Sequence, residues 1–298
     1  MTILEEIHEN LKNFKKIYDT IRIIDPLHKK VLLIDDDIIS PPIDTCYSFW
    51  KKSSACKNCV SIRARHHEDT FYKIEYIDDS VYLITASPYE YKGKVYIIEM
   101  LKNISVNGTV TNKSYKLNEI EHTLTEVTKE FLLDPLTNVY NRKFMYERLL
   151  SDINENLINN TPLSLIMADI DFFKKINDSY GHLIGDKVLH FFANILKNHF
   201  NKDSYWIARY GGEEFLIALN NTSLDEAYKL CEDLRIYIEN LNIKIDSLTI
   251  NLTCSFGMYT LNNELLDVDN AIKKVDKNLY SAKNLGRNTI FYDKSKQV

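Results

Sequence analysis

Residues 209–215 read Arg209-Tyr210-Gly211-Gly212-Glu213-Glu214-Phe215. Strand-forming residues flank this stretch at 205–210 and 215–220, which predicts a hairpin with the glycine pair at its turn. Two glycines permit a tight turn with positive φ and let a bulky ligand approach the backbone, and two carboxylates follow directly. An ordinary turn has the same pattern, so the hairpin alone does not indicate a function.

A second apolar run ends in two carboxylates. Residues 163–169 predict a buried strand with Asp169 and Asp171 at its end, where open α/β sheets usually bind ligands. The two acids share a face if the strand continues and diverge if it ends after Asp169. Placing Glu213 beside Asp169 would give oxygen ligands suited to Mg²⁺, which also takes substrate phosphates. Solvated acids at strand ends are the alternative interpretation.

Helices and strands alternate from Asp134 to the end of the chain. Apolar periodicity predicts helices at 142–157, 185–200, 224–240 and 268–284, and one more strand at 249–259. Such alternation is typical of an α/β domain whose central sheet is surrounded by helices, and we assign this domain to residues 134–298.

The first 110 residues have a different pattern. Short strand-like runs at 22–25 and 31–34 precede a cysteine-bearing middle segment, and three further runs predict an antiparallel meander at 71–77, 81–87 and 95–101. This layout predicts an α+β domain at residues 1–110. Residues 111–133 predict a helical linker, whose apolar residues at spacings of three and four fit either a short coiled coil or a helix packed on a neighbouring domain.

Composition narrows the classes of partner. The net charge of −5 argues against a nucleic-acid partner bound through a basic surface. No stretch approaches the roughly 18 apolar residues of a membrane span, and the N-terminus lacks the pattern of a signal peptide. We therefore expect no membrane span, a cytoplasmic location and reduced cysteines.

The C-terminal blocks together resemble the GGDEF family of diguanylate cyclases. The resemblance covers 134–292 and includes DPLTNVYNR (134–142), DIDFFKKINDSYGHLIGDKVL (169–189), RYGGEEF (209–215), SFG (255–257) and LYSAKNLGRN (279–288). The family usually has Gly-Leu where this chain has Asn138-Val139. The resemblance implies the nucleotidyl-cyclase-like fold of the family and condensation of two GTP into cyclic di-GMP and pyrophosphate, by a homodimer whose two Mg-bound GTP molecules face each other.

The resemblance also implies roles for individual residues. Asp169 and Glu213, with the backbone carbonyl of Ile170, would hold Mg²⁺ or Mn²⁺ at the GTP phosphates. The substrate-binding residues would be Asn177 and Asp186 for guanine, and Phe172, Phe173, Lys174, Lys283 and Arg287 for the phosphates. We count Asp169, Glu213 and Lys174 as catalytic; either Glu213 or a metal would help deprotonate the attacking 3′-hydroxyl.

One position departs from the family pattern. Many members carry an inhibitory product site, Arg-x-x-Asp, upstream of the glycine pair, and this chain has Lys202 and Tyr205 there. Lysine lacks the bidentate fork of arginine, and tyrosine cannot replace a carboxylate acceptor. We therefore expect no strong product inhibition through this site.

Cys46, Cys56 and Cys59 are the informative feature of the N-terminal domain. Their spacing permits a zinc site or an iron–sulfur cluster, with a fourth ligand from a nearby histidine, and buried free cysteines are the alternative. The strand layout and the opening RIIDP (22–26) resemble a PAS-like sensor domain, a family whose members bind various ligands or none.

Two other functions remain open from the sequence. A degenerate GGDEF module would bind GTP or cyclic di-GMP and signal to a partner, but such modules usually lose the motif acids or guanine contacts, which are all present here. An enzyme that makes a mixed purine cyclic dinucleotide is the third hypothesis, and Asp186 argues against it because a carboxylate suits guanine rather than adenine.

Overall fold

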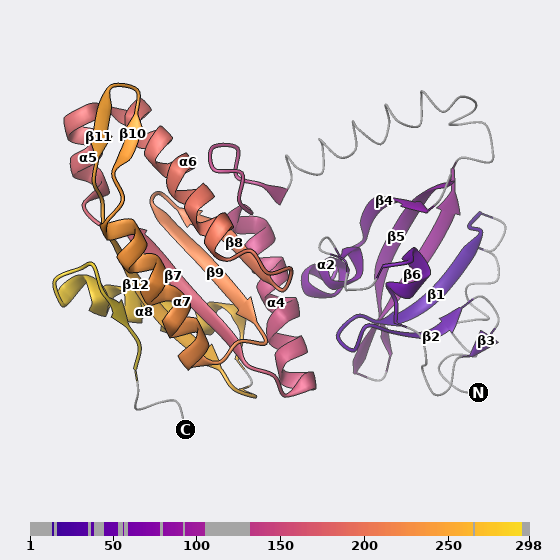
Figure 1. Ribbon diagram of the computed structural model, residues 1–298. Helices are drawn as coiled ribbons and strands as arrows, with labels where there is room; N and C mark the ends of the chain where they lie inside the picture. Colours follow the sequence, from indigo (N-terminus) through magenta and orange to yellow (C-terminus); the bar gives the residue numbers. More distant parts are fainter. Residues whose placement is uncertain are drawn as a thin grey trace. The chain divides into compact units, whose positions relative to one another are not determined.

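A computed structural model of the chain describes residues 14, 17–34, 37–38, 45–52, 56, 59–77, 80–91, 93–104, 132–264 and 266–293 (Figure 1). The chain divides into two compact units, Met1–Val127 and Thr128–Val298, and each is described by itself. The predicted linker helix lies outside the described residues except for Leu132 and Leu133. In the part of the chain that is described, no helix has the length and apolar character needed to cross a bilayer.

The N-terminal unit is built on one antiparallel sheet with the order β3-β2-β1-β6-β5-β4. Its strands are β1 (Thr20–Asp25), β2 (Lys30–Ile34), β3 (Asp37–Ile38), β4 (Phe71–Ile77), β5 (Ser80–Tyr91) and β6 (Lys94–Asn103). The predicted meander of the last three strands is confirmed by the antiparallel ladders of β4 with β5 and of β5 with β6. The pairing of β1 with β6 places the first and the last strand of this sheet side by side.

Two short helices, η2 (Ser48–Trp50) and α2 (Val60–His67), lie between β3 and β4 and cover one face of this sheet. The buried Arg22 of β1 forms an ion pair of 2.7 Å with Glu99 of β6, and Ser61 of α2 donates a hydrogen bond to the same carboxylate. The Arg22 guanidinium also lies 4.8 Å from the ring centre of Phe49. This charged pair therefore ties both helices to the sheet, as buried charges require.

The C-terminal unit contains a five-stranded sheet with the order β13-β12-β7-β9-β8. Its strands are β7 (Leu163–Ile170), β8 (Tyr205–Gly211), β9 (Glu214–Asn220), β12 (Cys254–Leu261) and β13 (Ile290–Phe291); β10 (Ile243–Ile245) and β11 (Leu248–Ile250) form a separate hairpin. The helices are α4 (Arg142–Asn159), α5 (Phe173–Tyr180), α6 (His182–His199), α7 (Leu224–Glu239) and α8 (Val268–Asn284). The predicted α/β architecture is thus confirmed.

The alternation of side chains along β7 gives the sheet two apolar faces. Ile166 and Ala168 join the cluster that contains residues of α5, α6 and α7. Leu165 and Met167 point the other way and join the cluster that contains residues of α4 and α8. The sheet is therefore buried between two layers of helices, and its strand ends are left for a site.

The single strand predicted at 249–259 is wrong. Residues 248–250 pair with β10, and β12 begins only at Cys254. Thr253 accounts for the break, because its carbonyl accepts a hydrogen bond of 2.9 Å from the Asp171 backbone and its hydroxyl donates to the Asp171 side chain. The sequence interpretation also missed α5, which has only eight residues and buries only Phe173 and Ile176.

Candidate active site

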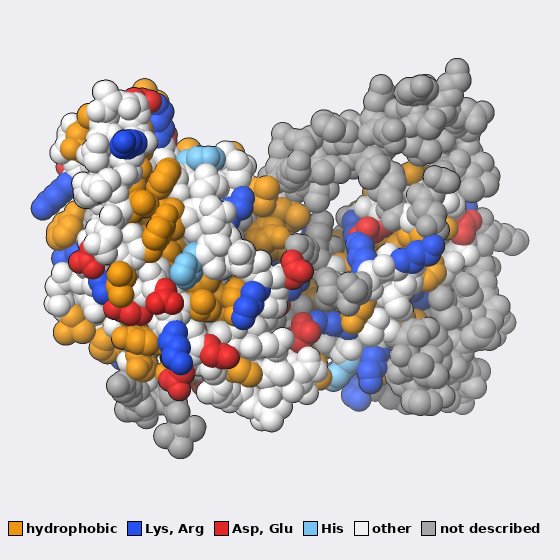
Figure 2. All heavy atoms as spheres, viewed as in Figure 1, with side chains coloured by type: hydrophobic (Ala, Val, Ile, Leu, Met, Phe, Trp, Pro, Cys, Tyr) orange, Lys and Arg blue, Asp and Glu red, His pale blue; other side chains and the backbone are white. Residues whose placement is uncertain are grey.

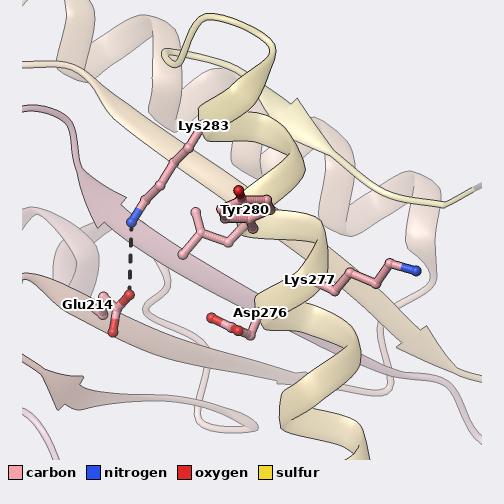
Figure 3. Close-up of a pocket in the computed structure, with 6 residues that line it drawn as sticks. Glu214, Asp276, Lys277, Tyr280 and Lys283 are labelled. Carbon is pink, nitrogen blue, oxygen red and sulfur yellow. Dashed lines mark ion pairs between the residues drawn. The ribbon is translucent and has the colours of Figure 1, made fainter.

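Two strands of the C-terminal sheet bring carboxylates together. Asp169 lies opposite Glu214 in the antiparallel ladder of β7 and β9, so both side chains lie on the face covered by α8. Lys283, in the last turn of α8, places its ammonium nitrogen 2.7 Å from the Asp169 carboxylate and 3.9 Å from that of Glu214. Figure 3 shows Lys283 reaching from the helix toward Glu214.

Contacts with the block DPLTNVYNR (134–142) hold the glycine hairpin in place. The Arg209 side chain donates one hydrogen bond of 2.9 Å to the Gly212 carbonyl and another of 3.2 Å to the Asp134 carboxylate. Asp134 in turn accepts hydrogen bonds from the backbone and the hydroxyl of Thr137. This chain of contacts fixes the turn that carries Glu213, which lies between β8 and β9.

The charge balance of the cluster is negative. Burial raises the pKa of Asp169 to about 6, and the neighbouring Glu213 and Glu214 carboxylates add to the rise while Lys283 opposes it. Burial also raises the pKa of Glu214, and Asp276 and Glu213 add to this effect. The carboxylates of this cluster outnumber the cations that act on them, so its balance of charge is negative; the carboxylates are those of Asp169, Glu213, Glu214 and Asp276, and the cations are Lys283 and Arg142.

A hard divalent cation fits this donor set. Carboxylate oxygens are the ligands that Mg²⁺ prefers, and it usually binds one or two of them together with phosphate oxygens. Among the described residues no group of three or more His, Cys, Asp or Glu side chains is arranged to hold a metal by itself. An ion at Asp169 and Glu213 would therefore depend on phosphate oxygens to complete its coordination.

Asp171 diverges from Asp169, because β7 ends at Ile170. Its buried carboxylate accepts hydrogen bonds from Ser255 (2.6 Å), Thr253 (2.7 Å) and the backbone of Asn288 (2.9 Å). Asp171 therefore joins the end of β7 to β12 and to the loop after α8.

The helix that carries Lys283 packs directly on β12. A Cβ atom at Gly257 would lie 2.1 Å from the Leu279 backbone nitrogen and 2.5 Å from the Val275 carbonyl oxygen. The Asn278 side chain also donates a hydrogen bond of 2.6 Å to the Met258 carbonyl. Only glycine, which has no Cβ atom, permits α8 to lie this close to β12. This requirement accounts for the glycine of the SFG block.

The turn after β7 places the predicted phosphate residues. Phe172 has a positive φ of 58° and is half exposed, and the Arg287 guanidinium lies 4.6 Å from the centre of its ring. Lys174 is exposed in the first turn of α5. Phe173 is a core residue, so a phosphate contact would have to come from its backbone N–H.

The predicted guanine residues lie on neighbouring helices. Asn177 belongs to α5 and Asp186 to α6, and a Cβ atom at Gly185 would lie 1.8 Å from the Asn177 side-chain oxygen. Helix α6 thus passes close to Asn177 at Gly185, and Asp186 is the next residue along α6. Buried residues of both helices pack in the apolar cluster on the face of the sheet opposite α8.

Comparison with known proteins identifies this arrangement. The family profile described as "Diguanylate cyclase, GGDEF domain" matches residues 131–289, which is more than half of the chain. The chain belongs to the GGDEF family. Diguanylate cyclase A of Treponema denticola is 38% identical over 165 residues, which cover 54% of this chain and 44% of that protein. The response regulator PleD of Caulobacter vibrioides is 33% identical over 178 residues, which cover 59% and 38%.

Solved structures agree with this membership. The coiled coil and GGDEF domain of DgcB from Caulobacter crescentus, in complex with c-di-GMP, aligns with a TM-score of 0.55 and 25% identity over 60% of this chain and 94% of that one. SiaD from Pseudomonas aeruginosa, in complex with its activator SiaC, aligns with a TM-score of 0.53 and 29% identity over 60% and 69%. The chain spans less than half the length of the first two curated relatives.

Lys202 and Tyr205, which stand where many family members have Arg-x-x-Asp, are in contact with each other in the GGDEF domain. The Lys202 ammonium lies 5.1 Å from the centre of the Tyr205 ring, and the Tyr205 hydroxyl accepts a hydrogen bond from Thr222. Both side chains are thus engaged within the domain. The absence of strong product inhibition stays a prediction.

Glu214 and Asp276 are the acidic residues of this site to which the sequence interpretation gave no role. Glu214 lies two residues before the buried Leu216, so the two side chains share a strand face, and this spacing could have predicted that Glu214 faces α8. The spacing of seven residues between Asp276 and Lys283 places both side chains on one face of the helix. Together with four other residues of this region they line a cavity described below.

Cys46, Cys56 and Cys59 lie in the N-terminal unit. All three are half-buried and free, and burial raises the pKa of the Cys46 and Cys59 thiols. Metal binding needs thiolates, and the three thiols are not arranged as a metal-holding group in the described part of this unit. A zinc site or iron–sulfur cluster at Cys46, Cys56 and Cys59 stays a prediction.

Proposed function

We propose that this chain is a diguanylate cyclase that condenses two GTP molecules into cyclic di-GMP and releases two pyrophosphates. The cluster of Asp169, Glu213 and Glu214 beside Lys283, next to the glycine hairpin, is the observation that carries the proposal. Membership of the GGDEF family supports it, as do relatives named as diguanylate cyclases. On the face drawn in Figure 2 acidic and basic side chains are interspersed, which suits a small-molecule substrate better than a nucleic acid.

Guanine is selected by hydrogen-bond pattern. The Asp186 carboxylate accepts from N1–H and N2–H₂ of guanine, while the Asn177 amide can both donate and accept. Adenine presents an acceptor at N1 and has no amino group at C2, so it would leave the carboxylate without a donor. These contacts favour GTP over ATP, so GTP is the proposed substrate.

The phosphates would lie at the turn between β7 and α5. The first backbone N–H groups of α5 and the Lys174 ammonium favour negative charge there. The contact of Arg287 with Phe172 brings a guanidinium to the same turn, and Lys283 approaches from α8. Metal ions held by Asp169, Glu213 and the Ile170 carbonyl would neutralise the charge that develops on the phosphoryl oxygens.

The reaction joins two nucleotides. The 3′-oxygen of one GTP forms a bond to the α-phosphorus of the other, and the bond from that phosphorus to the oxygen bridging to the β-phosphate breaks. The hydroxyl proton passes to Glu213 or to water, and pyrophosphate leaves. A second identical step closes the ring. Since each GGDEF domain would bind one GTP, two chains have to face each other as a homodimer.

The N-terminal unit is proposed as a PAS-like sensor that regulates this dimer. Three strands, a segment with two short helices and a three-stranded meander support the assignment, and all the strands belong to one antiparallel sheet. A signal bound there would change the population of the productive arrangement of the two GGDEF domains.

Incubation of the purified chain with GTP and Mg²⁺, followed by mass analysis of the products, tests the proposal. Cyclic di-GMP is expected, and an excess of ATP is expected to leave its rate unchanged. Tight binding of GTP without any product would contradict the proposal and favour a GGDEF module that only binds nucleotide.

A further inference from the structure

A cavity of about 360 Å³ opens between the first residue of β9 and the helix α8. It is lined by Glu214, Asp276, Lys277, Leu279, Tyr280 and Lys283. In Figure 3 the carboxylates of Glu214 and Asp276 face each other across the opening, with the Tyr280 ring above them, while Lys277 points away. Because Glu214 and Lys283 also belong to the carboxylate cluster, the cavity continues directly from the proposed active site.

The position of this cavity separates it from the proposed guanine site. Asp276 and Lys283 are on α8, which covers one face of the sheet, whereas α5 and α6 with Asn177 and Asp186 cover the other. Seven residues of helix place Asp276 about 10 Å from Lys283 along α8. A GTP with its base at α5 and α6 and its triphosphate at Lys283 has its ribose between those two points. That ribose does not reach Asp276.

The chemistry of the lining fits a sugar. A carboxylate that accepts hydrogen bonds from ribose hydroxyls is a recurrent feature of nucleotide sites. No hydrogen bond or ion pair engages the Asp276 carboxylate among the described residues, so its acceptors are available. The Tyr280 ring, which is largely exposed, offers apolar surface to a sugar face. A volume near the lower end of the range for ligand pockets suits part of a nucleotide rather than a whole one.

We propose that this cavity receives the ribose of the attacking GTP, which is held by the second copy of the chain, and that Asp276 accepts a hydrogen bond from its 2′-hydroxyl. This inference rests on the proposed cyclase function. Asp276 is thus a positioning residue that directs the neighbouring 3′-hydroxyl toward the α-phosphate beside Lys283. The cavity makes the reaction selective for ribonucleotides.

The test compares GTP with 2′-deoxy-GTP in the unsubstituted chain, in Asp276→Asn and in Asp269→Asn. Asp269 is an exposed acid two turns earlier on α8 and lies outside the cavity, so its substitution controls for lost charge on the helix. Loss of a hydrogen bond to a charged acceptor predicts a fall of about 10- to 100-fold in GTP turnover for Asp276→Asn. Turnover of 2′-deoxy-GTP should change little, so the preference for GTP should largely vanish, while Asp269→Asn keeps it.

A binding measurement distinguishes the resident nucleotide of one chain from the attacking nucleotide of the second chain. Binding of 3′-deoxy-GTP, which lacks the attacking hydroxyl, should be equally tight in all three proteins because the resident nucleotide does not reach Asp276. Weaker binding to Asp276→Asn would overturn the proposal, and so would an unchanged preference for GTP over 2′-deoxy-GTP, whatever the loss of rate. No product from the unsubstituted chain would instead refute the cyclase function, and this inference with it.

Discussion

The substitution Gly257→Ala tests how the fold positions the site. The new Cβ atom would lie 2.1 Å from the Leu279 nitrogen and 2.5 Å from the Val275 oxygen, both backbone atoms that cannot rotate away. To restore van der Waals contact, α8 would have to retreat from β12 by about 1 Å or more. Overpacking of this kind typically costs about 1–3 kcal/mol, and a contact between backbones belongs at the upper end.

The same retreat would displace Lys283, one turn beyond Leu279, from its contact of 2.7 Å with Asp169. The melting temperature and the GTP turnover of Gly257→Ala should therefore both be lower than those of the unsubstituted chain. About 3 kcal/mol corresponds to a decrease in Tm of roughly 6–12 °C for a domain of this size. Gly211→Ala is the matched control for stability, since its Cβ would meet nothing within 4 Å. Equal melting temperatures for the two variants would refute the packing argument.

Three further predictions concern other contacts of the GGDEF domain. Burial alone would raise the pKa of Asp134, but hydrogen bonds from Thr137 and Arg209 hold it below its ordinary 3.8, so the ionised carboxylate stabilises the fold at neutral pH and this contribution is lost as the pH falls through that range. Asp134→Asn should thus cost about 1 kcal/mol at pH 7 in urea titrations and much less at a pH well below 3.8, and an equal cost under the two conditions would contradict this. Trp206→Phe removes a hydrogen bond of 2.6 Å to the buried Asp152 and should lower the free energy of unfolding by about 1–3 kcal/mol, whereas an unchanged value would mean that Asp152 is satisfied without it. Calorimetry of the chain with cyclic di-GMP should show no tight binding at Lys202; tight binding that is lost in Lys202→Ala would contradict the predicted lack of a product site.

The elements that were predicted well are those whose pattern is local. The hairpin of β8 and β9 follows from two apolar runs around a glycine pair, and α8 follows from its periodicity. The break before Cys254 depends instead on hydrogen bonds between Thr253 and Asp171, which are 82 residues apart in the chain. No local pattern carries that information.

The same limit applies to the site. The acids of β7 and of the hairpin could be placed near each other because strand ends gather ligands, and the resemblance named Asp169 and Glu213. The pairing of Asp169 with Glu214 depends on the register between β7 and β9, which are separated in the chain by two helices and a strand. The cavity at Asp276 depends further on the close packing of α8 on Gly257. Register and packing are three-dimensional properties, and the sequence states neither of them directly.

The most direct test of the account is the amount of cyclic di-GMP formed from GTP and Mg²⁺ by the unsubstituted chain, Asp169→Ala and Glu213→Ala, with melting curves of all three. We predict product from the unsubstituted chain, loss of at least about 100-fold in both variants as for other electrostatic catalytic groups, and cooperative unfolding in each protein. Near-normal turnover by either folded variant would contradict the assignment of the carboxylate cluster as the catalytic site.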